Sequence, residues 1–485
     1  MRLYFVRREK VNFSSPVFIF IFLPVVWLLC ACLKRIEIKN AVLTVTSLIF
    51  YAFGGLVHLP LFLAETAICY IAGLILMKEG LKRRKTAASA AVIICIAVLC
   101  IYKYTDFAIE NINSVFPAAL KPLELTLPLA ISFYTFQGIS YVIDVYRDPQ
   151  KGTKKFQDLL LFMTFFPQLT QGPILRFSSF EPQLREREST PEHTVAGIRR
   201  FITGLAKKAI IANSLAGISD SIFGNLSGTV IDWRLAWLAG ISYALQIYYD
   251  FSGYSDMAVG LSSMFGFEIA ENFRFPYGAS SIREFWRRWH ISLSSWFRDY
   301  VYIPMGGSRQ GKLRTRINRM TVFLLTGIWH GASWTFIVWG ILHGILSDLE
   351  GDGIIPVEKL SKNSFGRVLC RAYTLLSVML LFVIFRADTI ADGWLVIKSM
   401  FAFRGTRTGL YELRSALTGT AVFVMITGIL FAGNLAPKLK ALIHDAEENN
   451  AVLSYAGMVL SLLLFIMCIL AISRGGFESF IYAAF

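Results

Sequence analysis

The fold of this chain is constrained above all by 11 apolar runs, each about the length that crosses a bilayer. A helix needs about 20 mostly apolar residues to span the hydrocarbon core. Hydrophobic residues make up 55% of the 485-residue chain and charged residues 17%, which excludes an ordinary soluble protein. We therefore expect an all-α polytopic membrane protein with about 11 transmembrane helices, at residues 14–33, 40–57, 59–77, 86–104, 123–145, 200–222, 233–250, 320–346, 368–386, 417–435 and 452–473.

The central third of the chain is more irregular than its ends. Segments such as FFPQLTQGPILRF (165–177) and QIYYDFSGYSDM (246–257) mix Pro, Gly, aromatic and charged residues. Irregular backbone at membrane depth is tolerated only where protein or a water-filled cavity covers it. We expect one membrane-embedded domain over 1–485, with a central cavity and a catalytic core at about 123–346. Shorter runs predict re-entrant or interfacial helices at 158–175, 253–266, 291–305 and 391–403.

The net charge of +15 reflects topology rather than nucleic-acid binding, because the Lys and Arg residues lie in short loops between apolar runs. Cytoplasmic loops carry the basic excess. We therefore place the loops at 104–122 and 348–362 outside, and the basic loops inside, at 34–39, 78–85, 147–155, 176–200 and 309–319.

The first ten residues, MRLYFVRREK, conflict with this orientation because they add four basic residues to an end that lies outside. The codon of Val11 can serve as a bacterial start, and a start there would remove the conflict. We expect the native protein to begin at Val11 and its first apolar run to be an uncleaved helix. A lipidation site at Cys32 is the less favoured alternative, because Cys30 and the following basic residues spoil the pattern.

Several possible motifs fail on inspection. The string GGSRQGK (306–312) has Leu313 where a phosphate loop needs Ser or Thr. The GYSDM string lacks the second Gly of a hydrolase elbow. The seven cysteines lie in or beside apolar runs and predict buried small residues, with no zinc spacing. Asp250 and Asp256 are expected to be paired or to line a cavity.

His330 is the main candidate for catalysis. It lies ten residues into the run at 320–346, about 15 Å along a helix. An ionisable side chain at that depth is functional by default. A neutral imidazole in an apolar site can accept a proton as a general base, and a structural bond to a neighbouring helix is the alternative. His343 is thirteen residues further, about 20 Å along a straight helix and on another face, and is expected to serve packing.

His290 lies in REFWRRWHISLSSWFRDYVYIPMGG (283–307), a stretch rich in Arg and Trp, as is typical near lipid headgroups. From the residues alone, a catalytic role and a plain interfacial position both stay open. The arginines around it are candidates for binding anionic lipid or a phosphate-bearing acyl donor, or for anchoring the topology: Arg283, Arg287, Arg288 and Arg298.

Many strings together give the chain a family resemblance that covers nearly its whole length. It is similar to the membrane-bound O-acyltransferase family, in its bacterial branch of alginate O-acetyltransferase membrane subunits and, more distantly, of teichoic-acid D-alanylation proteins. The strings that carry the resemblance are FSSPVFIFIFLP, LPLAISFYTFQGISYVIDVYR, FFPQLTQGPILRF, DFSGYSDMAVGLSSMFGF, NFRFPY, EFWRRWHISLSSWFRDYVYIPMGG, GIWHGASWTFIVWG and LFVIFRAD.

This resemblance implies an O-acetyltransferase in the bacterial plasma (inner) membrane that acylates a cell-surface or exported polysaccharide. His330 would be the catalytic base, and His290 would orient a substrate or stabilise the oxyanion. The resemblance implies no bound cofactor, with an acyl thioester such as acetyl-CoA or an acyl carrier protein as cosubstrate. The partners expected are an exported esterase-like acetyltransferase, the polysaccharide and membrane lipid. A polysaccharide or lipid-linked-sugar transporter, D-alanyl transfer to teichoic acid and a non-catalytic scaffold are the alternatives.

Overall fold

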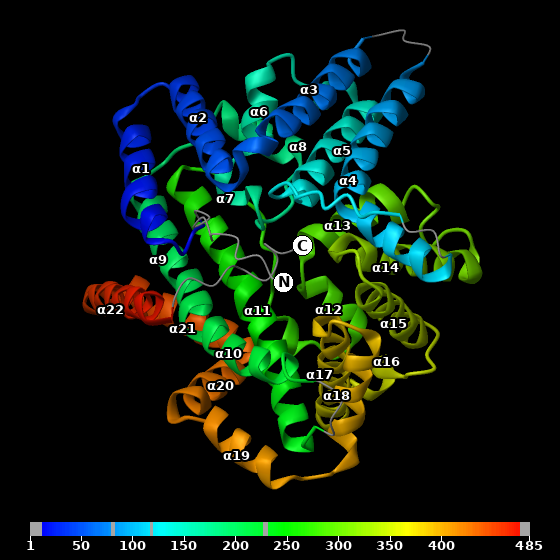
Figure 1. The fold of residues 1–485 in the computed structure, drawn as a ribbon. Coiled ribbons are helices and arrows are strands. Elements are labelled where there is room, and N and C mark those ends of the chain that lie inside the picture. The colour runs from blue at the N-terminus through cyan, green and yellow to red at the C-terminus, as the bar shows by residue number, and fades with distance from the viewer. Residues whose placement is uncertain (1–11, 79–82, 117–119, 227–230, 476–485) are drawn as a thin grey trace. The chain divides into compact units, whose positions relative to one another are not determined.

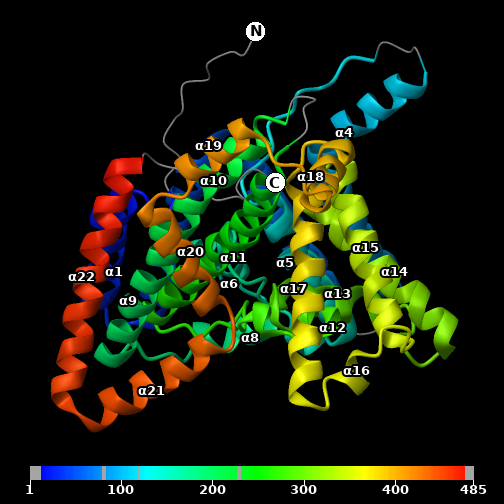
Figure 2. The same ribbon diagram turned by 90° about the horizontal axis from the view of Figure 1, so that it is seen from below.

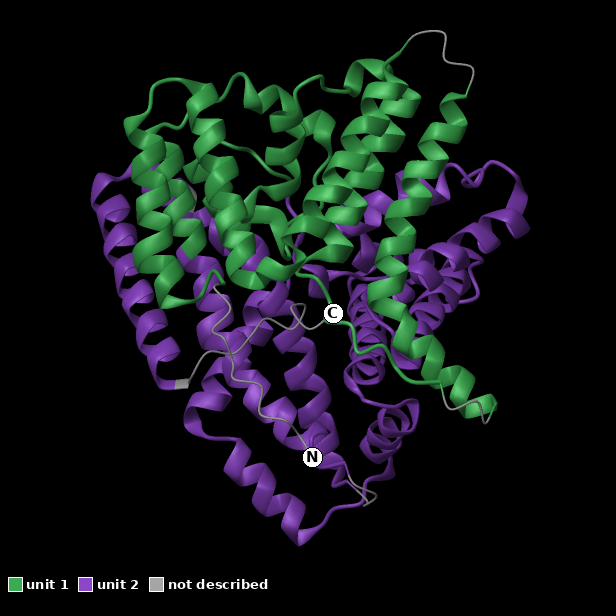
Figure 3. Ribbon diagram, turned by 45° about the horizontal axis from the view of Figure 1, so that its top comes forward, with its two compact units in different colours: residues 1–201, 257–270 green, residues 202–256, 271–485 purple. Residues whose placement is uncertain are grey.

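A computed structural model describes residues 12–78, 83–116, 120–226 and 231–475, and over these ranges the chain is helical with no strand (Figure 1). The all-α prediction is confirmed. The predicted start at Val11 lies outside the described residues. The chain divides into two compact units, Met1–Phe201 with Met257–Ala270, and Ile202–Asp256 with Glu271–Phe485 (Figure 3).

The first unit contains eight helices and the beginning of a ninth among its described residues. These are α1 Leu23–Cys32, α2 Ile36–Gly55, α3 Leu59–Leu76, α4 Arg84–Val115, α5 Ile131–Arg147, α6 Phe156–Thr164, α7 Phe166–Leu169, α8 Phe177–Phe180 and α9 Pro191–Ala206.

The second unit contains the remaining helices. These are α10 Asn213–Phe223, α11 Trp233–Met264 (whose last turns belong to the first unit), α12 Ile282–Arg288, α13 Ile291–Phe297, α14 Gly311–His330, α15 Trp334–Gly351, α16 Val357–Leu360, α17 Ser364–Arg386, α18 Ile390–Ala402, α19 Arg407–Ala416, α20 Gly419–Ala432, α21 Leu435–Asn449 and α22 Ala451–Gly475.

Five helical segments of the described chain are long and apolar enough to cross a membrane, and a bent pair, α19 with α20, makes a sixth if it forms one span. The first segment contains both α2 and α3, joined by a 3-10 turn at Leu56–His58. A polytopic membrane protein is therefore confirmed, whereas the count of 11 spans and the central cavity stay predictions. The five segments are Ile36–Leu76, Arg84–Val115, Pro191–Phe223, Ser364–Arg386 and Ala451–Arg474.

Two predicted boundaries are wrong for local reasons. The run at 123–145 becomes helical only at Ile131, because Pro128 disfavours helical backbone at the residue before it. The runs at 233–250 and 253–266 form one helix, α11, although each holds an aspartate.

Both aspartates of α11 are paired with the π-helical segment Lys207–Ala212. Lys208 Nζ donates to Asp250 at 2.6 Å, and Lys207 Nζ donates to Asp256 at 2.5 Å. Pairing lowers the cost of burying these charges, so they need not break the helix. The expectation that Asp250 and Asp256 are paired is confirmed.

The run at 320–346 is a helical hairpin rather than one span, which corrects the prediction. α14 ends at His330, and α15 begins at Trp334, where the Ser333 side chain accepts a hydrogen bond from the Thr335 amide as an N-cap. The two helices lie side by side in both views (Figures 1 and 2). A Cβ on Gly327 would be 2.4 Å from the Phe336 carbonyl oxygen, and one on Gly340 would be 2.4 Å from that of Phe323. These glycines therefore permit a close approach between the two arms of the hairpin.

The hairpin also reverses part of the predicted topology. Arg316 pairs with Asp352, and Arg319 pairs with Asp348, so the start of α14 and the end of α15 lie at the same end of the hairpin. The placement of 309–319 and 348–362 on opposite sides of the membrane is therefore wrong. The break at residues 331–333 turns the chain back, so both ends of the hairpin come to the same side.

Candidate active site

His330 is the last residue of α14 and lies at the tip of the hairpin. Its side chain is 1% exposed. It follows Arg319 by eleven residues, a rise of about 16 Å along α14. The imidazole meets the indole of Trp339 on α15 and the ring of Phe385 on α17 edge to face, with ring centroids 5.1 and 5.2 Å away. His330 is thus held in an aromatic, water-poor environment built by three helices.

His290 connects α12 to α13 and is fully buried, so it is no exposed interfacial residue. Its φ of +43° lies in the left-handed region, which histidine adopts more readily than most residues. The ring meets Phe251 of α11 edge to face, with centroids 4.7 Å apart. Burial lowers the pKa of His290, which lies outside the membrane-spanning helices, to about 3, so its imidazole is neutral.

Trp329 brings the two predicted site residues together. Its indole centroid lies 5.7 Å from that of His290 and 5.1 Å from that of His330. The two histidines are separated by 39 residues, most of α14 among them. They become neighbours because the α12–α13 junction packs against the end of α14. Both imidazoles therefore contact the same indole.

Asn272 fixes the tautomer of His290, and sequence reasoning missed this residue. Its Oδ1 must be an acceptor, because the Ser292 amide N–H donates to it at 3.1 Å. The His290 Nδ1, 3.2 Å from the same oxygen, must then carry the proton and donate. The Nε2 of the neutral ring is left with its lone pair, buried and without a hydrogen-bond partner among the described residues. The only sequence indication was the position of Asn272 in the string NFRFPY.

The arginine-rich helix before His290 is attached to the hairpin through Glu350 of α15. The Glu350 carboxylate accepts hydrogen bonds from the amides of Ile282 and Arg283, at 2.7 and 3.1 Å, at the N-terminus of α12. Burial raises the pKa of Glu350, which lies beyond the apolar part of α15. This cap fixes the start of α12 relative to the hairpin that carries His330.

His343 packs in the same region but at a different place. The Trp286 indole N–H donates to its Nδ1 at 3.2 Å, and its ring lies parallel to that of Phe285. The predicted separation of His330 and His343 along one straight helix is wrong, because the hairpin folds both against Trp339, with centroids 5.1 and 4.9 Å away. The hydrogen bond and the stacking accord with the packing role that we expected for His343.

Three of the four arginines around His290 have local acidic partners. Arg288 pairs with Glu284 at 2.5 Å, Arg298 with Asp299 at 2.7 Å and Arg283 with Glu358 at 3.9 Å. These contacts favour an anchoring role for them. Among the described residues, no group of three or more His, Cys, Asp or Glu side chains is arranged to hold a metal ion.

Comparison with known proteins agrees with the helical membrane fold. The model of the MBOAT, membrane-bound O-acyltransferase family matches residues 155–351, which include both histidines of the site. The chain is 37% identical, over 98% of its length and all of the relative, to a probable alginate O-acetylase AlgI of Azotobacter vinelandii. It is 40% identical to the probable AlgI of Pseudomonas aeruginosa, over 86% of this chain and 80% of the relative. It is 35% identical to the peptidoglycan O-acetyltransferase of Helicobacter pylori, over 81% of this chain and 80% of the relative.

By its relatives, this helical membrane protein is an acyltransferase. The chain belongs to the membrane-bound O-acyltransferase family. The predicted enzyme class is confirmed, and the resemblance to the alginate O-acetylase branch is confirmed as well.

Proposed function

We propose that this protein transfers an acetyl group from a cytoplasmic thioester to hydroxyl groups of a cell-surface or exported polysaccharide. The observation that carries the proposal is the pair of buried histidines, His290 and His330, whose ring centroids lie 5.7 and 5.1 Å from that of the Trp329 indole. The relatives named above include probable alginate O-acetylases and a peptidoglycan O-acetyltransferase, which supports acetyl as the acyl group and a polysaccharide as the acceptor.

In the proposed reaction, His330 is the general base. It takes the proton from an acceptor hydroxyl as the hydroxyl oxygen forms a bond to the thioester carbonyl carbon. The carbon–sulfur bond then breaks, and the sulfur leaves with the proton that His330 had accepted. The product is an O-acetyl ester and a free thiol, so all atoms are accounted for.

We assign to His290 the role of orienting the acceptor hydroxyl. Because its Nδ1–H is donated to Asn272, its Nε2 can accept a hydrogen bond from the incoming hydroxyl. Donation to an oxyanion would require a protonated ring, which the buried, neutral state disfavours. Of the two roles expected for His290, the structure therefore supports orientation better than oxyanion stabilisation.

The proposal includes the surroundings of the enzyme. We place it in the bacterial plasma (inner) membrane, with acetyl-CoA or an acetylated acyl carrier protein as the donor and no resident cofactor. An exported esterase-like acetyltransferase would act as its partner outside, and lipid would surround its apolar helices.

Everted membrane vesicles from a strain that carries the protein provide the test. Radiolabelled acetyl-CoA is added outside, which corresponds to the cytoplasmic face, and alkali-labile label is measured in carbohydrate. Vesicles with the protein should accumulate such label, whereas vesicles from a strain lacking it should not. Equal labelling in the two would contradict the proposal. A transporter would instead change the amount of polysaccharide exported and leave the acetate per sugar unchanged.

A further inference from the structure

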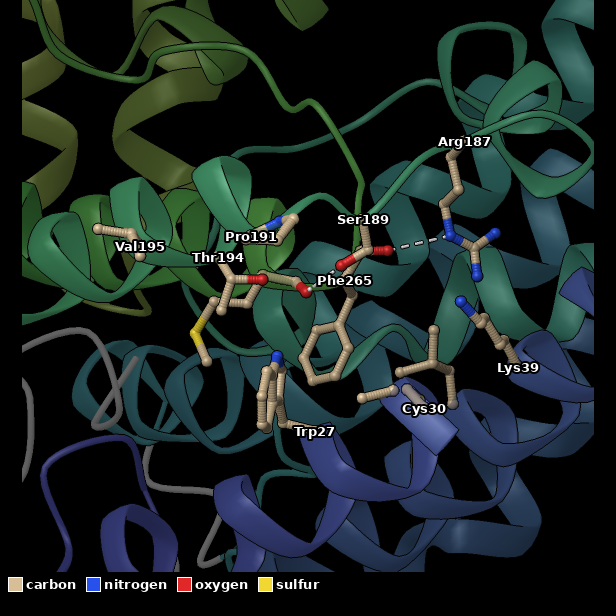
Figure 4. A pocket seen from close by; sticks show the side chains of 12 residues that line it. Trp27, Cys30, Lys39, Arg187, Ser189, Pro191, Thr194, Val195 and Phe265 are labelled. Carbon is tan, nitrogen blue, oxygen red and sulfur yellow. Dashed lines mark hydrogen bonds between the residues drawn. The ribbon is translucent and has the colours of Figure 1, made fainter. Parts of the chain in front are cut away.

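A cavity of about 390 Å³ lies in the first unit, away from the two histidines in sequence and built from none of the site residues. It is lined by the end of α1, the beginning of α2, the segment before α9, the first turn of α9 and the chain around Phe265 (Figure 4). Its volume falls within the range of about 300–1,000 Å³ that is typical of small-ligand sites.

One end of the cavity is cationic. Lys39 of α2 and Arg187 lie close together there (Figure 4). Within the described part of the chain, no carboxylate forms an ion pair with either side chain. Two neighbouring cations repel each other in a partly dry site, so an anion bound between them would be favourable.

Arg187 is held rigidly enough to act as a fixed donor. Its Nε donates to the Phe265 carbonyl at 3.1 Å, its Nη1 donates to the Gln183 carbonyl at 2.9 Å, and its guanidinium lies over the Phe267 ring at 4.1 Å. Its Nη2 has no hydrogen-bond partner among the described residues. A guanidinium fixed in this way can bind a phosphate oxygen with little loss of conformational entropy.

The other end of the cavity is apolar and lies beside exposed apolar residues of α1 and α9. Trp27 and Val195 lie toward that end (Figure 4), and Leu43, Met264 and Phe265 also line the cavity. Large apolar residues beside it on α1 and α9 are exposed on the protein: Val25, Leu28, Leu29, Val195 and Ile198. In a membrane protein such residues contact acyl chains, so the apolar end opens toward the bilayer rather than toward water.

We propose that this cavity is a binding site for an anionic phospholipid such as phosphatidylglycerol. The phosphate would lie between Lys39 and Arg187, and the first part of an acyl chain would follow the apolar wall past Trp27. The order of groups in the cavity, cations at one end and lipid-facing apolar surface at the other, matches an amphiphile and not a free anion. This lipid site is separate from the proposed acyl transfer, and neither proposal depends on the other.

Native mass spectrometry of the purified full-length protein can test this site. The protein is incubated with an equimolar mixture of phosphatidylglycerol and phosphatidylcholine that carry the same acyl chains. The test variant is Lys39→Gln. It should fold, because the Lys39 side chain is only half buried and makes no hydrogen bond among the described residues. The matched controls are Lys39→Arg, which keeps the charge, and Arg35→Gln, which removes an exposed charge at the same end of α2 but outside the cavity.

The wild-type protein should retain phosphatidylglycerol over phosphatidylcholine by about fivefold, which corresponds to the attraction of one basic residue for an anionic headgroup. Lys39→Gln should lose that preference, whereas both controls should keep it within about twofold. An unchanged preference in Lys39→Gln would overturn the proposal, and so would equal retention of the two lipids. Displacement of phosphatidylglycerol by millimolar inorganic phosphate would assign the cavity to free anions instead.

Discussion

The side chains of Asn272 and His290 are joined by a 3.2 Å hydrogen bond in which the imidazole is the donor. Asn272 Oδ1 also accepts from the amide and the hydroxyl of Ser292, at 3.1 and 2.9 Å, and the amide N–H, which can only donate, fixes its acceptor role. Its Nδ2 donates to the Ser255 hydroxyl at 3.3 Å, which fixes the other end of the amide. The orientation and the proton position of His290 therefore depend on one side chain that touches no substrate atom in our proposal.

Replacing Asn272 should impair acetyl transfer in a way that depends on the new side chain. Asn272→Leu removes the acceptor and frees the His290 tautomer, so we expect activity to fall about 10- to 100-fold. Asn272→Asp keeps an acceptor for His290 and for Ser292, so it should retain activity within about tenfold of wild type. Alkali-labile acetate in surface carbohydrate, normalised to the amount of protein in the membrane, measures both. Equal activity in the two variants would show that the hydrogen bond does not position His290.

The hairpin makes the effect of a small substitution on α15 predictable. A methyl group on Gly340 would be 2.4 Å from the Phe323 carbonyl oxygen, so Gly340→Ala must push α14 and α15 apart. We expect a loss of about 1–3 kcal/mol in the free energy of unfolding, typical of overpacking. The control is Gly217→Ala on α10, where nothing lies within 4 Å of the added carbon, and it should be neutral or slightly stabilising. Thermal unfolding of the purified proteins distinguishes them, and equal midpoints would contradict the close packing.

The same hairpin predicts where its two ends lie in the membrane. Cysteines placed at Lys312, early in α14, and at Lys362, after α15, should react with a membrane-impermeant maleimide from the same side. Both positions are exposed, so accessibility does not separate them. Labelling of one from the periplasmic side and of the other only after cell lysis would mean that residues 320–346 cross the membrane after all.

His343 should matter for stability rather than for chemistry. His343→Leu leaves the half-buried indole N–H of Trp286 without its acceptor, which should cost about 1 kcal/mol. Removing both partners in Trp286→Phe/His343→Leu should restore part of that loss. Melting temperatures and acetyl transfer per folded molecule are the two readouts. Abolished transfer in His343→Leu at normal stability would place His343 in the catalytic machinery.

Sequence alone was sufficient for the composition-driven parts of the fold. The all-α membrane class follows from the length and apolarity of the runs, and a run such as 368–386 corresponds closely to α17, Ser364–Arg386. The pairing of Asp250 and Asp256 was also predictable, because a buried charge requires a partner. Which residues would supply it was not, since Lys207 and Lys208 are more than 40 residues away.

The hydropathy pattern of the sequence could not predict the turn at Gly331, for a physical reason. The run at 320–346 is apolar on both sides of the break, so hydropathy cannot tell one span from two packed arms. The hairpin is favoured over a single span by the close contact between Gly327 and Gly340. The ion pairs of Arg316 and Arg319 with the end of α15 favour it as well. Asn272 was missed because a single amide side chain forms no periodic pattern in the sequence. Its role depends on the fold, which brings it next to His290.

The most direct test of the account is the acetate content of surface carbohydrate in a strain whose only copy carries His330→Gln. The control is His193→Gln, which changes an exposed histidine outside the site. With both variants at wild-type abundance in the membrane, we predict that alkali-labile acetate falls to the level of the deletion strain for His330→Gln and stays at the wild-type level for His193→Gln. Wild-type acetate content in the His330→Gln strain would contradict the assignment of His330 as the catalytic base.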